Sequence, residues 1–514
     1  MKTKFKAYAS LLLAMVLLLA LPGQAFACTT VYAGANLTAD GSTLFGRSED
    51  YSADYAKLYS AVPAGVHTAG EVYDGCYGFH WTFTHDSYAY TAFCDDNSQG
   101  VCPDCGSEHA HTPYQAGGTN EMGLSMTATE TLHGSDAVLA VDPYTDAGIE
   151  EAEITTVVLS EAASAKEALE LLTSIYAEVG ANAGSGILLA DSQEAWYLEN
   201  LSGTQYLAVK LNADLLFVEP NIAMIGLIDL KDTENVYASD ALIKTAVEAG
   251  SFVGDEEAQL IDYAASYAAV SGGNTYHRLA AGLNFLDAEA GWPADLTAEG
   301  IESGAYRLSN VDAEGNTVSL YTNVSADKAL DAQSIIDFYK VSPIGKPGNT
   351  ETHFFQLKAG EDPALETVEW FSMDNAAYNV FVPYYPLLTT GVYEAYEAGC
   401  GFAEYVEKEP ASGTFFPAEE GVWVVFPEGW ESSYYWVFAA LSHVAQADEE
   451  AAAHITEVLA GVQETVNADW AALQEAVAGA EDPAAVATAG SAAMAEQVYT
   501  AALALLAEYG LAEG

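Results

Sequence analysis

Basic side chains are scarce in this chain of 514 residues: 16 Lys and Arg stand against 74 Asp and Glu, which gives a net charge of -58. Such a surface repels the phosphate backbones of DNA and RNA, so nucleic acid is excluded as a partner. The acidic residues are scattered rather than gathered in blocks, which is typical of a solvated surface. Half of the residues are hydrophobic, so the chain can bury a large core and is not a disordered protein.

Long apolar runs are also missing, apart from one near the N-terminus. Residues 9–21 are apolar and uncharged, but this run is shorter than the about 20 residues that span a bilayer. Lysines precede it, and Ala25-Phe26-Ala27 follows as an A-x-A cleavage pattern. We therefore expect residues 1–27 to be a secretory signal peptide, the mature protein to be secreted or extracellular, and no later segment to form a stable membrane span.

A lipoprotein leader would also end just before a cysteine and would anchor the protein at the cell surface. A lipobox has a Leu-like residue three positions before that cysteine and a small residue two positions before it. Ala25 and Phe26 stand at those places. The sequence therefore favours the secretory signal over the lipid anchor.

A Ser-His-Asp signature is lacking as well, and the position of Cys28 makes one unnecessary. Cleavage after Ala27 would place an α-amine beside the sulfur of Cys28. A free α-amine titrates near pKa ~7.7–8.0, so it accepts a proton close to neutral pH. Nucleophile and general base can then belong to one residue, which is the N-terminal-nucleophile (Ntn) route to acyl transfer.

The residues that follow Cys28 predict a β-hairpin with charged residues near its open end. Two strand-like stretches flank Asp40-Gly41, a dipeptide typical of tight hairpin turns. With the turn there, Cys28 faces position 53, and Asp50 lies roughly 10 Å away along the partner strand. A carboxylate at Asp50 can orient an ammonium group, and Arg47 can bind a substrate carboxylate with two hydrogen bonds. An ordinary surface ion pair is the alternative for these two residues.

The rest of the chain mixes strands and helices in an α+β pattern. Residues 161–179 have apolar side chains at helical spacing, and residues 184–211 read as successive strands with a turn at Asp191-Ser192. Ala- and Glu-rich sequence with helical spacing follows from about residue 433, with a break near Pro483. Strands in hairpins together with helices favour antiparallel sheets covered by helices.

Several stretches resemble, in order, the dipeptidase A family of cysteine Ntn hydrolases. The resemblance begins at Cys28 and extends to about Pro386. Each stretch by itself is a weak signal, but their common order makes a strong one. They read CTTVYAGANLTADGSTLFGRSEDY, NEMGLSMTATET, ADSQEAWYLENLSGTQYLAVKL, VEPNIAMIG, NTYHRLAAGLNFL, ETHFFQL and NVFVPYYP.

The resemblance implies a four-layer αββα Ntn-hydrolase fold and the hydrolysis of dipeptides, with no cofactor. It divides the chain into the signal peptide, a catalytic domain over residues 28–432 and a helical C-terminal extension over residues 433–514 packed on that domain. It also implies the site residues, which are Cys28 as nucleophile, Arg47 and Asp50 beside its amine, Asn221 at the oxyanion or the amine, and Arg278. Asn221 as a turn residue and Arg278 at a helix end remain the plain structural alternatives.

An insert over about residues 76–114 is rich in Cys, His and Asp and is not general in that family. Four cysteines lie in it, and outside the cell two disulfides are the expected pairing. A C-x-x-C pair also suits a tetrahedral structural zinc. Both interpretations stay open for the same set, which is Cys76, Cys94, Cys102 and Cys105.

Two other functions stay open beside the dipeptidase. Related Ntn enzymes cleave other small amides, as penicillin V acylases and bile-salt hydrolases do, and their oxyanion-hole Asn aligns here near Glu130. A catalytically idle, lipid-anchored binding protein is the alternative outside the enzymes. The expected partner is a dipeptide or small amide substrate, and the sequence does not define the oligomeric state.

Overall fold

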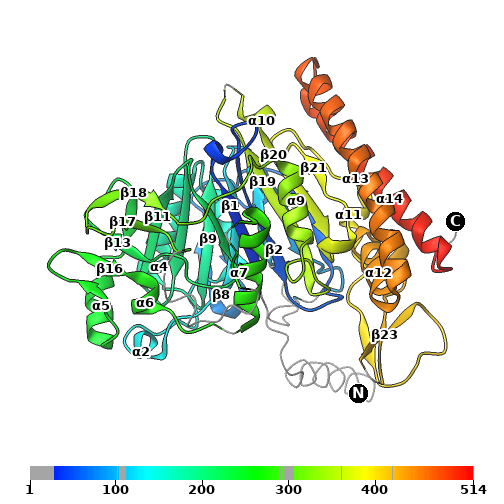
Figure 1. Cartoon of the computed structure of the whole chain (residues 1–514). Coiled ribbons are helices and arrows are strands. Elements are labelled where there is room, and N and C mark those ends of the chain that lie inside the picture. Colours follow the sequence, from blue (N-terminus) through cyan, green and yellow to red (C-terminus); the bar gives the residue numbers. More distant parts are fainter. Residues whose placement is uncertain are drawn as a thin grey trace.

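The computed structural model describes residues 28–100, 102, 112–271, 273–289, 291–293, 306–360, 362–419 and 421–512. The expected signal peptide, Cys105 and the side chain of Glu130 lie outside the described residues. Two antiparallel sheets form the centre of the molecule, and Figure 1 shows them with helices on their outer sides. Among the described residues, no helix is both long and apolar enough to cross a membrane.

The first sheet has six strands and carries Cys28 at the start of one of them. Its strands pair antiparallel throughout and are almost wholly buried, because helices cover one face and the second sheet covers the other. In spatial order they are β12 (Leu216–Glu219), β1 (Thr29–Ala33), β2 (Thr43–Asp50), β19 (Asn349–Leu357), β20 (Thr367–Met373) and β21 (Val382–Tyr384).

The second sheet has eight strands, also antiparallel. The expected strands around Asp191-Ser192 are confirmed, because Ala190 pairs with Ala195 across that turn. In spatial order the strands are β14 (Val236–Ala238), β11 (Tyr206–Leu211), β10 (Ala195–Asn200), β9 (Gly184–Ala190), β8 (Ser125–Leu132), β7 (Gln115–Thr119), β6 (Tyr90–Asp95) and β3 (Lys57–Val62).

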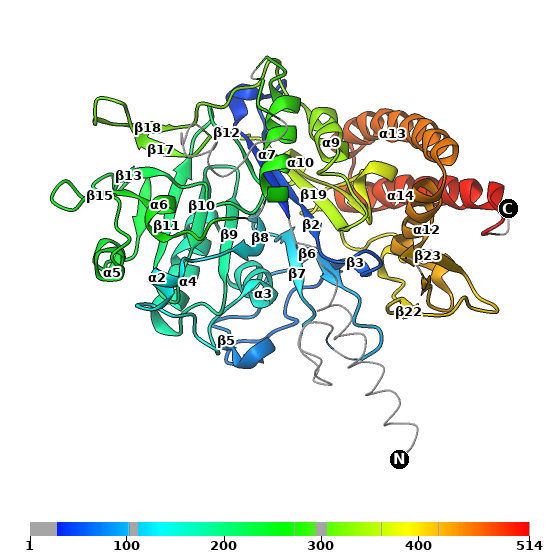
Figure 2. The same cartoon turned by 60° about the horizontal axis from the view of Figure 1, so that its bottom comes forward.

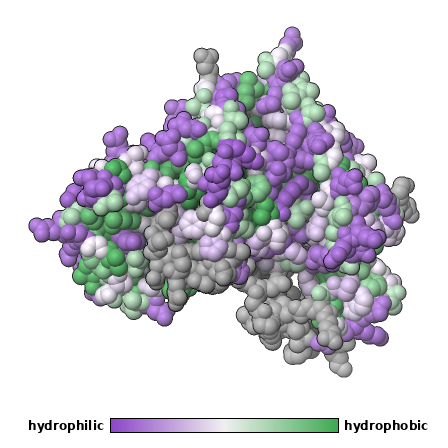
Figure 3. All heavy atoms as spheres, viewed as in Figure 1, coloured by the Kyte–Doolittle hydropathy of each residue, from purple (hydrophilic) through white to green (hydrophobic). Residues whose placement is uncertain are grey.

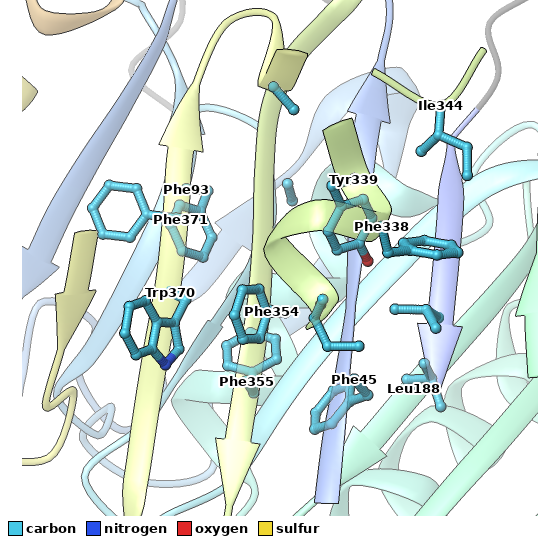
Figure 4. Close-up of a cluster of buried hydrophobic side chains, with 14 of the residues drawn as sticks. Phe45, Phe93, Leu188, Phe338, Tyr339, Ile344, Phe354, Phe355, Trp370 and Phe371 are labelled. Atoms are coloured by element: carbon cyan, nitrogen blue, oxygen red, sulfur yellow. The ribbon is translucent and has the colours of Figure 1, made fainter. Parts of the chain in front are cut away.

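Aromatic side chains fill the space between the two sheets. The ring of Phe93 on β6 stacks on His353 of β19, with ring centroids 4.6 Å apart. Tyr59 on β3 meets Phe371 on β20 at 4.2 Å. Figure 4 shows Phe93 beside Phe371 between the sheets, with further aromatic residues along β19 and β20. Burying such large rings supplies much of the favourable free energy of folding.

Helices cover the outer face of each sheet. α3 (Glu151–Glu161) and α4 (Ala165–Glu178) lie on the eight-stranded sheet, and Ser164 begins α4 by accepting a hydrogen bond from the N–H of Glu167. The six-stranded sheet is covered by α7 (Gly273–Leu286), α9 (Ala332–Lys340) and α12 (Tyr434–Ala447). The expected four-layer αββα order, with antiparallel sheets, is therefore confirmed.

The C-terminal part is helical, as expected. α13 (Glu449–Ala478) and α14 (Pro483–Glu508) form a long antiparallel pair that extends beyond the sheets in Figures 1 and 2. Pro483 opens α14 at a position where a helix tolerates proline, with Asp482 as the capping residue. Trp470 of α13 packs against Trp370 of β20 at 5.9 Å, which ties this pair to the first sheet. The domain boundary at residue 432 stays a prediction.

The surface seen in Figure 3 is largely hydrophilic, in keeping with the acidic composition.

Smaller elements surround the two sheets. The remaining strands are β4 (Val72–Asp74), β5 (His80–Thr82), β13 (Leu227–Asp229), β15 (Gly254–Asp255), β16 (Leu260–Asp262), β17 (Ser309–Val311), β18 (Thr317–Tyr321), β22 (Glu404–Val406), β23 (Phe415–Glu419) and β24 (Val422–Val425). The short helices are α2 (Asp136–Leu139), α5 (Leu242–Ala249), α6 (Tyr263–Tyr267), α10 (Pro363–Glu366) and α11 (Glu394–Glu397), with 3-10 turns η1 (Ala35–Leu37), η2 (Cys76–Gly78), η3 (Ala376–Tyr378) and η4 (Trp430–Ser432).

Candidate active site

Cys28 directly precedes β1 and is buried, with 4% of its surface exposed. β1 lies between β12 and β2, so residues from both neighbouring strands surround the cysteine. Thr29 pairs with Ser48, and Thr30 pairs with Arg47. Cys28 therefore lies close to residues of β12 and β2 that are distant from it in sequence.

The predicted hairpin register is wrong. A tight turn at Asp40-Gly41 would place Cys28 opposite position 53, whereas the observed pairing of Thr29 with Ser48 shifts β2 by several residues. The reason is that the connection is a longer loop: η1 follows β1, and Thr38 bridges to Leu330 instead of continuing the hairpin. The shift brings Asp50 nearer to Cys28 than the sequence predicted.

Arg47 is completely buried and extends from β2 toward the second sheet. Its Nη1 donates to the carbonyl of Ala128 on β8 and to Oε1 of Glu151 at 2.5 Å. Its Nη2 meets the hydroxyl of Tyr114 at 2.5 Å and Oε2 of Glu49 at 3.4 Å. Burial lowers the pKa of Arg47, but Tyr114 and Glu151 raise it by more than burial lowers it. The net shift is upward, and the guanidinium stays charged.

A second buried cation, Lys57, continues this ionic cluster. Nζ of Lys57 lies 2.5 Å from Oε1 of Glu49 and pairs with Asp95. Tyr55 donates to the other oxygen of Asp95 at 2.7 Å. Burial raises the pKa of Asp95 to about 6, against the opposing charge of Lys57. Charges in such a cluster are held in place because each has a partner of opposite sign.

Asp50 lies at the end of β2 with its own partners. Nδ2 of Asn349 donates to Oδ1 at 2.5 Å, and Nζ of Lys346 lies 3.0 Å from Oδ2. Burial raises the pKa of Asp50, while Lys346 and Arg278 oppose the shift. The charge of Asp50 also acts on the thiol of Cys28. Asp50 is thus a buried carboxyl group close to the cysteine and not a surface ion pair.

Arg278 of α7 joins the segment around Cys28 to the loop after β12. Nη1 donates to the carbonyl oxygen of Cys28 and, at 2.8 Å, to Oγ1 of Thr29. Nη2 donates to the carbonyl of Pro220 at 2.9 Å and to Oδ1 of Asn221 at 2.8 Å. The partners of Arg278 are therefore neutral oxygens, and burial lowers its pKa against the opposing charge of Asp50.

Asn221 has an unusual backbone conformation. Its φ is 67°, in the left-handed region where Asn is one of the few tolerated residues other than Gly. Its main-chain carbonyl accepts from Oγ of Ser271 at 3.1 Å. Asn221 is buried and lies in a turn, which was the structural alternative predicted for it. Its side chain also contacts Arg278.

The thiol of Cys28 experiences both signs of charge. Burial raises its pKa to about 11, Arg47 lowers it, and Glu151, Asp50 and Glu49 raise it. An α-ammonium group on Cys28 would add a positive charge next to the sulfur and lower the pKa of the thiol. Cleavage before Cys28 would therefore change the electrostatics of the nucleophile as well as supply a base.

The structure brings all five expected residues to one place, and it adds others that the sequence analysis missed. Glu151 and Tyr114 bind Arg47 across the two sheets, and Asn349 and Lys346 hold Asp50. Asn349 lies two positions before the stretch ETHFFQL, which was the one available signal. Glu151 carried no signal, because an acidic residue in the first turn of a helix is common for dipole reasons alone.

Three cysteines of the insert, Cys76, Cys94 and Cys102, lie in the described structure. Sγ of Cys76 lies 3.7 Å from Sγ of Cys102, and Sγ of Cys94 contacts the carbonyl of Leu58 at 3.8 Å. In the described part of the chain, no disulfide joins the cysteines and no cluster of three or more His, Cys, Asp or Glu is arranged to hold a metal. Because Cys105 lies outside that part, the disulfide and zinc interpretations both stay predictions.

Comparison with known proteins identifies the family of this chain. It is 32% identical over 390 residues to a protein named probable dipeptidase B from Streptococcus pyogenes serotype M1, which covers 73% of this chain and 75% of that protein. A probable dipeptidase from Salmonella dublin is 30% identical over 406 residues, or 74% of this chain and 84% of that protein.

Among solved structures, the penicillin V acylase from Agrobacterium tumefaciens aligns over 70% of this chain and 85% of its own, at 14% identity and a TM-score of 0.30. That TM-score is too low to inform the function. The model of Peptidase family C69 matches residues 27–400. With most of its length matched to that family, and with relatives of this similarity, the chain belongs to Peptidase family C69 and is a peptidase of the hydrolase class.

Proposed function

We propose that this protein is a secreted cysteine-type dipeptidase whose nucleophile is Cys28, made N-terminal by removal of residues 1–27. Three observations support the proposal. The A-x-A pattern ends at Ala27, the match to the peptidase family begins at the same residue, and two relatives are named as dipeptidases. Secretion rests on the sequence pattern of the leader.

The observation that carries the proposal is the hydrogen bond from Arg278 to Cys28, with further buried charges nearby. Arg278 binds its carbonyl oxygen, and the charges of Arg47 and Asp50 both act on its thiol. These residues come from α7 and β2, and Arg278 in turn binds Asn221 from the loop after β12. A merely structural cysteine needs no such convergence of buried charge, which costs free energy to bury and clusters at functional sites.

In the proposed reaction the α-amine of Cys28 accepts the thiol proton while the sulfur attacks the scissile carbonyl carbon. The S–C bond forms, the C–N bond breaks, and the ammonium returns the proton to the leaving amine. Water then attacks the thioester, and the amine again takes and returns a proton, so that the acid product leaves and the thiol is restored.

The surrounding residues have separate tasks in this scheme. Arg47 is already bound by protein carboxylates, so it acts as a fixed positive charge that favours the thiolate and does not bind the substrate carboxylate. Asp50 orients the α-ammonium. The side-chain amide of Asn221 donates to the oxyanion, and Arg278 holds that side chain and the carbonyl of Cys28 in register.

The deciding experiment is a comparison of Cys28→Ala with wild type on a dipeptide panel. We expect the variant to be secreted and folded but to have no measurable hydrolysis, because both nucleophile and thiolate chemistry are lost. Cys400→Ala is the matched control, since this half-buried cysteine contacts Gly429 away from the site and its loss should leave the rate unchanged. Dipeptide hydrolysis at the wild-type rate by Cys28→Ala would contradict the proposal.

Two further measurements separate the alternatives. The mass and N-terminal sequence of the secreted protein should give a chain that starts at Cys28 with a free amine, whereas a diacylglyceryl mass would indicate the lipid-anchored protein. Penicillin V and conjugated bile salts should be poor substrates beside the dipeptides. Faster turnover of either amide would assign the site to an acylase-like reaction.

A further inference from the structure

Glu219 is a buried carboxyl group next to the candidate site with no role in the reaction as proposed. It ends β12 and lies directly opposite Thr30 of β1, two residues after Cys28. Its side chain is inaccessible to solvent. A buried carboxyl group needs hydrogen-bond partners to offset the loss of hydration, so its contacts reveal what it stabilises.

Besides the side chain of Thr30 on β1, those contacts are two successive backbone amides of the loop that carries Asn221. Oε1 of Glu219 accepts from the N–H of Asn221 and, at 3.0 Å, from the N–H of Ile222. Pro220, which lies between Glu219 and Asn221, has no N–H to donate. Two consecutive amides that converge on one anion form a concave backbone site, and this geometry requires an unusual conformation such as the φ of 67° at Asn221.

The far end of the same loop is held in the same way. Oε1 of Glu199 on β10 accepts from the N–H of Met224 at 2.5 Å. Because β12 belongs to the first sheet and β10 to the second, the loop from Glu219 to Met224 is attached to both sheets through buried carboxyl groups. Such a loop has a fixed position relative to β1, which begins immediately after Cys28.

We propose that Glu219 is a positioning residue for the dipeptidase reaction: its carboxyl oxygen holds Asn221 in the left-handed conformation, and through Asn221 and Arg278 it sets the position of Cys28. The link is continuous. Asn221 contacts Arg278 at 2.8 Å, and Arg278 binds both Thr29 and the carbonyl of Cys28. This inference rests on the proposed function, since it assigns Glu219 to that same site.

Two mild substitutions separate the position of the acceptor from the charge. Glu219→Gln keeps an oxygen at the same reach, so kcat should stay within about threefold of wild type. Glu219→Asp keeps the charge but withdraws the oxygen by one methylene, and kcat should fall about 10- to 100-fold with KM within about threefold, because displaced catalytic groups lose rate before they lose binding. A Gln variant that loses as much as the Asp variant, or an Asp variant equal to wild type, would overturn the inference.

The matched control is Glu369→Asp. Glu369 is an equally buried glutamate on β20, which β2 and β19 separate from β1, and it accepts from Tyr59 at 2.8 Å and Thr91 at 2.7 Å. Its shortening should leave kcat within about threefold. An equal loss of kcat in both Asp variants would mean that the effect is general loosening of the core, and the inference would fail.

A double-mutant cycle tests the route through Asn221. Glycine adopts the left-handed conformation without help, so in an Asn221→Gly background the further change Glu219→Asp should cost less than about threefold in kcat. The same loss in both backgrounds would show that Glu219 acts by another route. A wild-type enzyme that hydrolyses no dipeptide would instead defeat the proposed function.

A readout that needs no substrate keeps the two failures distinct. Alkylation of Cys28 by iodoacetamide, followed by peptide mass, should differ several-fold between Glu219→Asp and wild type and stay unchanged in Glu369→Asp. Equal alkylation rates in all three proteins would count against the positioning role even if the reaction catalysed is not dipeptide hydrolysis.

Discussion

Two buried arginines flank Cys28, and they are bound by opposite kinds of partner. Arg47 meets the carboxylates of Glu151 and Glu49, whereas Arg278 meets two carbonyl oxygens, a hydroxyl and the amide oxygen of Asn221. The pKa of Arg47 is raised in balance, while burial lowers that of Arg278. One arginine is neutralised where it lies, and the other uses its charge to organise the main chain.

Because their partners differ, the two arginines have different roles at the site. The charge of Arg47 lowers the pKa of the thiol, although Glu151 and Glu49 oppose it, and its pairing with those carboxylates makes it costly to remove. Arg278 fixes geometry, because its fork of donors joins the start of β1 to the loop of Asn221. The two sides of the site should therefore respond differently to substitution.

The largest expected effect is on stability. Arg47→Met should lower the free energy of unfolding by about 3–5 kcal/mol, because it removes the positive charge that pairs with the buried carboxylate of Glu151. Arg278→Met leaves only neutral acceptors and should cost about 1–3 kcal/mol. Urea unfolding of both variants measures the difference, and adding Glu151→Gln to Arg47→Met should restore part of the loss. An equal or larger loss for Arg278→Met would break the comparison.

A smaller effect is the pH dependence of the free energy of unfolding that Glu199 causes, at the far end of the loop that carries Asn221. Burial raises the pKa of Glu199 to about 8, above the value of about 4.3 in an unfolded chain. The folded protein thus favours the protonated form, so this contribution to stability is full below about pH 4 and is lost as the pH rises through 8. We expect Glu199→Gln to gain on wild type with rising pH, by on the order of 3 kcal/mol at pH 9.

Unfolding by urea at pH 5, 7 and 9 checks this expectation. The exposed Glu404 supplies the control, since Glu404→Gln should show no such trend. A constant difference between Glu199→Gln and wild type at all three pH values would mean that Glu199 is ionised when folded.

The smallest effect concerns the substrate. Because both site arginines are occupied by protein groups and the chain carries a net charge of -58, the site offers little to attract an acidic side chain. Neutral dipeptides such as Ala-Ala should have a several-fold higher kcat/KM than Asp-Ala at low salt, and added salt should narrow the gap. A preference for Asp-Ala would show that local contacts in the pocket outweigh the surface field.

Local sequence patterns predicted the elements that depend on neighbours along the chain. The helix of α4 followed from its apolar spacing, the turn at Asp191-Ser192 joined two strands, and the break near Pro483 coincides with the start of α14. Each is decided within a few residues by periodicity, capping or turn chemistry. The register between β1 and β2 was predicted wrongly, because a contact of Thr38 with Leu330, far along the chain, reshapes the connection.

The sequence by itself determined the identity of the candidate nucleophile, since an A-x-A pattern before Cys28 and the ordered resemblance to a peptidase family can be read without coordinates. Only the tertiary structure decided what surrounds Cys28. Glu151 reaches Arg47 from the helix side of the other sheet, and Glu219 meets Asn221 because β12 pairs with β1. Such contacts arise from the stacking and order of strands, which bring together residues that no local spacing relates.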